Sequence, residues 1–462
     1  MISILVIEPL VDIFNYRAQI LISQGGNKMK FAEYKKKKVF ITGKTIVGID
    51  PAKEKHQASI MNEYGIQVGK SFSFRVNFDG FNLTLWKKLK NTIAQPTPQS
   101  VVFAIETSCN LWKTLAHYLH NKGYTVLLVN PLTTHHSRPL MSHDFSKTDP
   151  KDAFLVAKNA FDAHYYFYHN FTPYINKIHQ LNITYSKLLK DRNRNLLRIR
   201  SLMEEIFPEY LLCLHIDSKT SLYLLQSYFM PHHFLNLDME NLASLIKKIS
   251  HSNYDKQLLL DIKDAATKTI GVDKSSEEKT LRVILDSWLL EFNQLSAQMS
   301  IVMDEMIALT KETEYFSILT SIKGISDTLA AQFISECRDL NNFKHYKQIE
   351  KLAGLNVYQS QSGNYVGPRH ISHIGDKRLL HIIYQMTAET AHYIPEVRIK
   401  FLKRQLVKRA YRKNIIASSS ALLQLIMALI KEKRPYEFKQ NKMQELAILE
   451  EKYKKLKSCN AH

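Results

Sequence analysis

Glycine is distributed so unevenly along this chain that it separates regions of different structure. The 462 residues contain 14 glycines, and only Gly271 lies between Tyr124 and Lys323. Glycine marks tight turns and weakens helices, so a long stretch nearly without it is typical of long helices. Five glycines then fall between Gly324 and Gly375, which predicts tight turns in that stretch.

Before the glycine-poor tract, residues 39–160 have the pattern of an α/β domain. Short apolar runs predict strands at 39–40 with 45–50, at 57–62, at 68–76, at 100–106 and at 124–129. Helical patterns fall at 86–93 and 111–122. Three strands in hairpin succession, followed by strand, helix, strand and helix, is the order of a ribonuclease H-like domain.

The rest of the chain is expected to be helical. Apolar residues at helical spacing predict long paired helices in 175–316, either a dimerising coiled coil or an all-helical insert. The Lys/Glu-rich end predicts a solvated helical tail. We therefore expect five parts: an N-terminal appendage at 1–38, the α/β domain at 39–165, a helical middle at 166–316, a compact all-α domain at 317–436 and the tail at 437–462.

Four carboxylates occupy positions that can converge at one edge of the predicted sheet. Asp50 ends the strand in IVGID and Glu106 ends the strand in FAIET, while Asp149 and Asp152 open a helix in KTDPKDA. Their spacing of three puts the last two on one helical face. Gathered carboxylates repel unless cations neutralise them, and oxygen ligands select Mg²⁺ or Mn²⁺. Two such ions can clamp the attacking and leaving oxygens of a phosphodiester.

Each carboxylate alone also has an ordinary structural interpretation. Asp149 before Pro150 fits a helix N-cap, Asp152 suits the helix dipole, and Asp50 before a proline fits a turn. Glu106 has no obvious structural task at the end of a buried strand. The set of four in this order of elements favours a metal site.

The glycine-rich stretch contains two candidate features. Lys323 and Gly324 lie in a short turn between helical patterns, which predicts either a helix–hairpin–helix-like phosphate contact or an ordinary helical hairpin. Ser362 precedes Gly363 in a polar loop, where a lone serine is most often a turn residue. The groups that follow it can transfer protons or stabilise charge; they are Arg369, His370, His373, Lys377 and Arg378.

The net charge of +20 points to a polyanionic partner, either nucleic acid or a membrane surface. Residues 318–435 hold 19 Lys and Arg against 8 Asp and Glu, which favours nucleic acid. Eight basic residues and no acid lie within 398–413, and we interpret them as phosphate contacts on one helical segment. They include Lys403, Arg404, Lys408, Arg409 and Arg412.

The sequence also predicts a cytoplasmic protein. Four widely spaced cysteines without a CxxC pair fit a reducing compartment rather than a disulfide or zinc scaffold. The apolar run at 2–23 contains Glu8, Pro9, Asp12 and Arg17, so it predicts neither a membrane span nor a secretory signal. Because Met29 precedes the first strand pattern, residues 1–28 are interpreted as an appendage or an upstream start.

The motifs VGIDPAKEKH, FAIET, LLVNP and KTDPKDAFLVA resemble those of the DEDD transposases of bacterial insertion sequences. This group, the IS110 family, includes the pilin-gene invertase, and its catalytic half is similar to the junction resolvase RuvC. The segments IKGIS, AGL, QSG and HISHIGDKRL resemble its C-terminal transposase domain.

The resemblance implies a DNA transposase in which Asp50, Glu106, Asp149 and Asp152 bind Mg²⁺ or Mn²⁺. It implies that a serine attacks DNA to form a phosphoserine intermediate; we place it at Ser362, with Ser360 as the alternative. It further implies contacts to element and target DNA, a guide (bridge) RNA, and a homo-oligomer, either dimer or tetramer. The alternatives are a metal-only RuvC-like nuclease and an inactive nucleic-acid-binding derivative.

Overall fold

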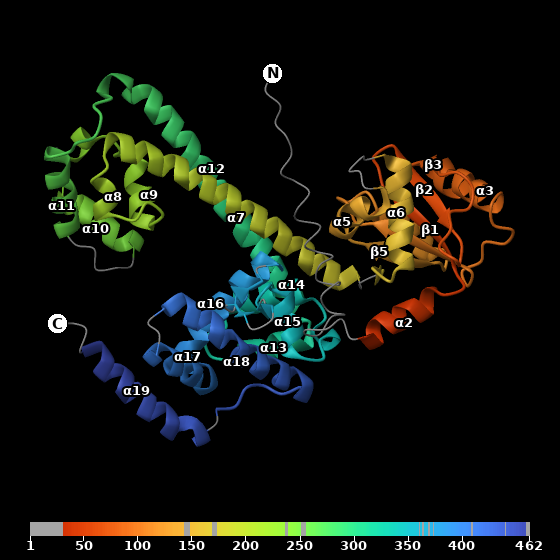
Figure 1. Ribbon diagram of the computed structural model, residues 1–462. Helices are drawn as coiled ribbons and strands as arrows, with labels where there is room; N and C mark the ends of the chain where they lie inside the picture. Colours follow the sequence, from red (N-terminus) through yellow and green to blue (C-terminus); the bar gives the residue numbers. More distant parts are fainter. Residues whose placement is uncertain are drawn as a thin grey trace. The chain divides into compact units, whose positions relative to one another are not determined.

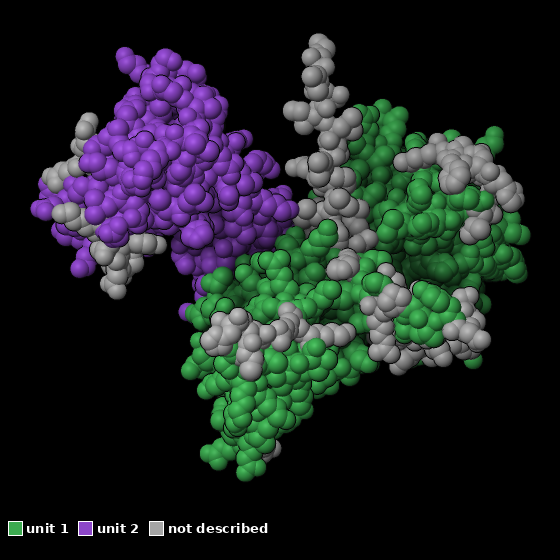
Figure 2. Space-filling model, turned by 60° about the vertical axis from the view of Figure 1, so that its left-hand side comes forward, with its two compact units in different colours: residues 1–176, 313–462 green, residues 177–312 purple. Residues whose placement is uncertain are grey.

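A computed structural model of the 462-residue chain describes residues 31–142, 148–168, 173–235, 239–250, 256–359, 361–362, 365–367, 370–372, 374–407, 410–438 and 440–458. Figure 1 traces the elements of the chain. Its two compact units are residues 1–176 with 313–462, and residues 177–312 (Figure 2). The predicted appendage at 1–28 lies outside the described residues.

A six-stranded mixed sheet forms the core of the N-terminal region, with the order β3-β2-β1-β4-β5-β6. The central strands β1 (Thr45–Asp50) and β4 (Val101–Glu106) are parallel, and β5 (Thr125–Val129) runs parallel to β4. On the other side, β2 (Lys55–Met61) and β3 (Phe72–Arg75) continue the sheet as antiparallel strands. The predicted mixed α/β region is thereby confirmed.

Helices cover both faces of this sheet (Figure 1). Helix α6 (Asp149–Phe161) packs on β1 and β2, and its Val156, Ala157 and Ala160 join the core on that face. The opposite face is covered by α3 (Leu85–Lys90), which follows a π-helical turn, η1 (Gly80–Thr84), and by α4 (Lys113–Asn121).

Two parts of the strand prediction are wrong. Val39 and Phe40 belong to helix α2 (Phe31–Ile41), not to a strand. Tertiary contacts fix this helix, because Lys37 donates to the Tyr165 carbonyl at 2.8 Å and Tyr165 donates back to the Lys37 carbonyl at 2.9 Å. The strand predicted at 68–76 shortens to β3, since Gly69 turns the chain before it with a φ of +70°.

Two elements of the α/β region had no sequence prediction. The short strand β6 (Tyr166–Phe167) pairs antiparallel with β5 at the edge of the sheet. Helix α5 (Pro131–Ser142) follows β5 directly and packs against α6. The side chain of Asn130 accepts the Leu132 amide at 2.9 Å, so Asn130 and Pro131 are the N-cap and first residue of α5.

The glycine-poor tract forms long helices, as predicted. Helices α7 (Pro173–Ile206) and α12 (Glu278–Lys311) each have 34 residues and lie side by side (Figure 1). Asn195 of α7 donates to Glu291 of α12 at 2.5 Å. The smaller helices pack near one end of this pair; they are α8 (Tyr210–Cys213), α9 (Lys219–Leu225), α10 (Met239–Ser250) and α11 (Lys256–Thr267).

Helix α18 (Tyr411–Glu432) is the central helix of the C-terminal region. By length and composition alone it is apolar enough to cross a membrane. Its apolar residues are instead buried, and it packs against four other helices; these are α13 (Glu314–Thr320), α15 (Tyr346–Leu352), α16 (Lys377–Tyr393) and α17 (Pro395–Val407). The apolar composition of α18 is therefore that of a core helix.

The C-terminal region differs from the prediction in two ways. It is not purely helical, because β7 (Val357–Tyr358) pairs with β10 (His370–Ile371) and β8 (Gln361–Ser362) pairs with β9 (Tyr365–Val366). The tail is not simply solvated either, because α19 (Met443–Ser458) packs along α17. Its Glu450 pairs with Arg398 at 2.6 Å, a contact that the charge pattern of the tail could not assign to a partner.

Candidate active site

Two of the four predicted carboxylates end neighbouring parallel strands. The registers of β1 and β4 align Ile49 with Ile105, so Asp50 and Glu106 follow at the same edge of the sheet. Side chains alternate along a strand. Because Ile46 and Ala104 belong to the core on the α6 side, the alternation places Asp50 and Glu106 on that same side.

The first turn of α6 brings Asp152 to the same edge. The whole residue is only 2% exposed although it carries a carboxylate. Gly48 of β1 makes this placement possible, because a Cβ there would lie 2.5 Å from the Ala157 nitrogen and closer still to the Ala153 carbonyl oxygen. Only a residue without a side chain lets α6 approach β1 this closely.

Asp149 has different surroundings from Asp152. It is exposed, and it is the first residue of α6. The N-cap of α6 is Thr148, so the interpretation of Asp149 as a helix cap is wrong. The helix begins one residue earlier than that interpretation requires, with Pro150 at its second position. Asp149 therefore lies at the solvent side of the helix start.

An arginine that the sequence did not single out lies among these carboxylates. Arg138 of α5 donates from Nε to Asp152 Oδ1 at 2.9 Å and from Nη2 to Asp152 Oδ2 at 3.0 Å. These hydrogen bonds raise the pKa of Arg138 above its ordinary value, and the charges of Glu106 and Asp50 act in the same direction. Arg138 is thus bonded to the carboxylate of α6 and is stabilised by the charges of the two carboxylates that end β1 and β4.

A local signal for this arginine was present in the sequence. Asn130 followed by Pro131 is a helix-start signature directly after a buried strand. A helix that begins at this position would place Arg138 near the edge of the sheet at which β5 ends. No local pattern in the sequence indicates that Arg138 pairs with Asp152. The two residues are 14 positions apart, and their contact depends on how α5 packs on α6.

The predicted nucleophile lies in a short β-ribbon that connects α15 to α16. Ser362 of β8 pairs with Tyr365 of β9, with two residues between them. At the base of the ribbon, the Ser372 amide donates to the Asn356 carbonyl at 2.9 Å. Ser360, Gly363, Arg369 and His373 lie outside the described residues.

The predicted basic contacts at the start of α16 are divided between surface and interior. Lys377 is exposed. Arg378 instead donates to buried Glu336 at 2.8 Å from Nε and at 3.2 Å from Nη2. Asp376 caps the helix by accepting the Arg378 amide at 2.8 Å, and burial, with the charge of Glu336, raises the pKa of Asp376 to about 6. Arg378 thus has an internal partner.

The Lys323–Gly324 turn connects α13 to α14 (Asp327–Cys337). Gly324 has a φ of +101°, and a Cβ there would lie 3.1 Å from the backbone of Glu389 and Thr390 in α16. The Lys323 ammonium lies 4.7 Å from the centre of the Tyr393 ring. The glycine is therefore required for close packing on α16, in a turn between two helices.

The basic run at 398–413 belongs to two helices rather than one. Helix α17 ends at Val407 and α18 begins at Tyr411, and buried Asn414 of α18 donates to Gln405 of α17 at 2.7 Å. The chain must reverse so that the apolar faces of these helices pack together. Lys403, Arg404 and Arg412 are exposed, whereas Lys408 and Arg409 are outside the described residues.

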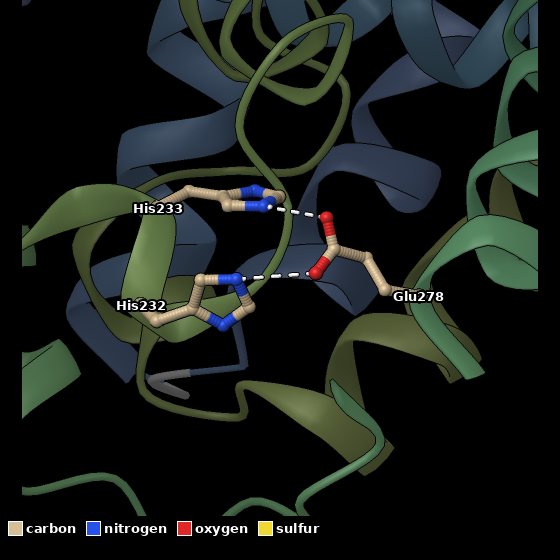
Figure 3. Close-up of side chains that lie close together, drawn as sticks. All are labelled: His232, His233 and Glu278. Atoms are coloured by element: carbon tan, nitrogen blue, oxygen red, sulfur yellow. Dashed lines mark hydrogen bonds and ion pairs between the residues drawn. The ribbon is translucent and has the colours of Figure 1, made fainter. Parts of the chain in front are cut away.

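A second group of possible metal ligands lies in the helical unit (Figure 3). His232 and His233 both contact Glu278, with Nε2–oxygen distances of 3.2 and 3.0 Å. The Nδ1 atom of His233 accepts the amides of Phe229 and Met230 at 3.3 Å each. Its Nε2 therefore carries the proton and has no lone pair for a metal. We assign this cluster a structural role at the start of α12.

Comparisons with known proteins match the α/β region and the helical C-terminal region separately. A family model described as a transposase, of the DEDD IS110 type, matches residues 47–208. The model of the transposase IS116/IS110/IS902 family matches residues 316–401. The first match includes the four carboxylates and Arg138, and the second includes Ser362.

One curated relative extends this similarity over most of the chain. It is described as the insertion element IS116 uncharacterized 44.8 kDa protein of Streptomyces clavuligerus. The two sequences are 22% identical over 390 residues, which cover 80% of this chain and 94% of the relative.

Proposed function

Because this chain belongs to the IS110 family of transposases, we propose that it cuts and rejoins the DNA of an insertion sequence with a carboxylate-held metal and a serine nucleophile. The observation that carries the proposal is the position of Asp50 and Glu106 at the ends of neighbouring parallel strands, with buried Asp152 and its partner Arg138 at the same edge. A site that gathers three negative charges around one cation has the electrostatics that a divalent ion requires.

The residues at this edge fit Mg²⁺ or Mn²⁺. All donors are carboxylate oxygens, which such hard cations prefer. Asp50, Glu106 and Asp152 would hold the ion, with Asp149 at the exposed side of the same helical turn. A bound ion would neutralise the scissile phosphate and stabilise the charge that develops on its oxygens.

Ser362 would supply the nucleophile. Its Oγ forms a bond to phosphorus, its proton passes to a base, and the bond from phosphorus to one deoxyribose oxygen breaks. The departing oxygen takes up a proton and leaves as a hydroxyl. A deoxyribose hydroxyl of a second strand can then attack the phosphoserine and release the serine, which exchanges strands without external energy.

The fold supports the assignment of this region to a ribonuclease H-like, RuvC-like domain. The sheet has three antiparallel strands followed by two parallel ones, with β1 in the centre and the carboxylates at its end. We infer a cytoplasmic, oligomeric enzyme on element and target DNA. We also infer that a guide RNA supplies sequence specificity, as the family resemblance implies.

The test is whether a covalent protein–DNA adduct forms. Purified protein is incubated with DNA that contains the element ends, its guide RNA and Mg²⁺, and is then denatured. We expect a wild-type adduct that resists denaturation, and none from Ser362→Ala, which should retain DNA binding. Ser360→Ala should still form the adduct. If Ser360→Ala lost the adduct and Ser362→Ala kept it, the nucleophile would be Ser360.

The second candidate is a metal-only nuclease in which water attacks the phosphate. It is favoured by one observation: Asp50, Glu106 and Asp152 all come from the elements of the α/β region. In that case Ser362→Ala would cleave DNA at the wild-type rate, and no adduct would form with either protein.

The packing of α19 on α17 predicts a limit on DNA binding. Glu450 engages Arg398 at 2.6 and 3.1 Å, and Glu445 pairs with Lys403 at 2.5 Å. These carboxylates neutralise the charges of Arg398 and Lys403, which would otherwise attract DNA phosphates. Glu450→Gln should therefore tighten binding to duplex DNA by about two- to tenfold at low salt. Fluorescence anisotropy across a salt series measures this change.

The neighbouring residue provides a matched control. Glu451 pairs with Lys455 of its own helix at 2.6 Å, so Glu451→Gln makes the same change of net charge without uncovering α17. We expect it to change the DNA affinity by less than about twofold. Equal tightening by both variants would mean that net charge alone, and not the contact with Arg398, limits binding.

A further inference from the structure

Arg138 is held at the carboxylate site more firmly than a surface cation would be. Its side chain is 17% exposed and that of Asp152 is 3% exposed, so the pair is nearly removed from water. Both carboxylate oxygens of Asp152 accept from the guanidinium, at 2.9 and 3.0 Å. Bidentate pairing of this kind fixes the orientation of both groups.

The helix that carries Arg138 is itself fixed to α6. Ser137 donates to the Asn159 side chain at 2.8 Å, and Asn159 is a buried residue of α6. Thr134, one turn earlier, is fully buried. These contacts fix α5 against α6, so the arginine reaches Asp152 from a rigid support.

The electrostatics of the site require a cation there. Asp152 is buried beside two further carboxylates, and like charges at short range in a poorly solvated site repel strongly. The guanidinium supplies one compensating charge. A divalent ion bound by the same carboxylates would supply two, and it would repel a guanidinium that shares Asp152.

We propose that Arg138 is a positioning residue. It binds the Asp152 carboxylate when no metal ion is present, and it competes with the metal ion for that carboxylate. This inference rests on the proposed metal-dependent function and adds to it a residue that controls metal binding. Arg138 stabilises the carboxylate site when no ion is bound, and it sets the affinity for the ion. With a metal ion present, Arg138 would give up its hydrogen bonds to Asp152, and its guanidinium would then be available to a DNA phosphate.

The test measures Mn²⁺ binding and thermal unfolding of the full chain without DNA. Arg138→Met keeps much of the side-chain volume and removes the charge, and Arg138→Lys keeps the charge but loses the bidentate fork. Free Mn²⁺ is followed by electron paramagnetic resonance, and melting temperatures are compared in EDTA and in Mn²⁺.

We expect Arg138→Met to bind Mn²⁺ about tenfold more tightly than wild type and to melt at a lower temperature in EDTA. Mn²⁺ should restore most of that loss. Arg138→Lys should give an intermediate affinity, and it serves as the test if Arg138→Met does not fold without metal. These results would not follow if Arg138 were only a structural partner of Asp152.

Arg378 offers a matched control. It makes a similar bidentate pair with buried Glu336, which lies on α14 of the helical C-terminal region. Arg378→Met should lower the melting temperature equally in EDTA and in Mn²⁺ and leave the Mn²⁺ affinity unchanged.

Three results would overturn the inference, and they are distinguishable. Unchanged Mn²⁺ affinity in Arg138→Met would show that Arg138 does not compete with the metal, while the metal site itself would still stand. Weaker affinity would show that Arg138 supports the bound ion rather than competing with it. Failure of the wild-type protein to bind Mn²⁺ would overturn both this inference and the proposed metal-dependent function.

Discussion

Asp152→Asn is expected to lower metal-dependent DNA cleavage by at least about a thousandfold. Asp152 is the most buried of the four carboxylates and lies at the start of α6 against the strand edge that carries Asp50 and Glu106. Asparagine keeps the shape but removes a negative charge that the metal needs. Cleavage of labelled DNA over a Mg²⁺ series measures the loss.

DNA binding should be retained in this variant, because the basic residues that we propose as DNA contacts lie elsewhere in the chain. Asp162→Asn is the control; Asp162 follows the last turn of α6, where Lys38 and Lys158 contact it at 3.5 and 3.2 Å. This variant changes the same charge at the opposite end of the helix and should cleave DNA like wild type. If Asp152→Asn cleaved DNA as fast as the wild type, Asp152 would not be a ligand of the proposed metal site.

Gly48→Ala is expected to destabilise the α/β region by about 3 kcal/mol or more. The added Cβ would collide with the backbone of Ala153 and Ala157, which cannot turn aside as a flexible side chain does. Helix α6 must move away from β1, and Asp152 moves with it. We therefore expect a lower melting temperature and, in the fraction that remains folded, weaker Mn²⁺ binding.

Gly123→Ala separates this packing effect from the general cost of replacing glycine. Gly123 has a φ of +83°, and no atom lies within 4 Å of the position that a Cβ would take. Its replacement should cost only about 1–2 kcal/mol, from the left-handed backbone, and should not affect Mn²⁺ binding. A Gly48→Ala protein as stable as Gly123→Ala would show that α6 can shift without strain.

Local patterns in the sequence were enough to predict most of the carboxylate site. Short β-branched runs indicate buried strands, and the ends of parallel strands meet at one edge of a sheet. The positions of Asp50 and Glu106 at two strand ends were therefore sufficient to place them together. The spacing of Asp149 and Asp152 predicted one helical face; both lie in the first turn of α6, but Asp149 is exposed and Asp152 is buried, a difference that the spacing could not show.

Two of the wrong predictions have a common physical cause. Residues 39–40 have a strand-like composition but are helical in α2, because Lys37 and Tyr165 exchange hydrogen bonds across 128 residues. The tail has the mixed charges of a solvated helix, yet Glu445 and Glu450 pair with α17. Such contacts join segments far apart in the sequence, and no local pattern encodes them.

Local patterns along the chain were sufficient to indicate which residues are available for chemistry and which elements carry them. Strand ends, a glycine-poor helical tract and a glycine-rich loop follow from side-chain shape and backbone freedom, which act over a few residues. In contrast, the way the helices pack was needed to identify the cation that faces the carboxylates and the acids that cover the basic helix α17. Arg138 and Glu450 have these roles because packing brings α5 to α6 and α19 to α17, and charges interact through space rather than along the chain.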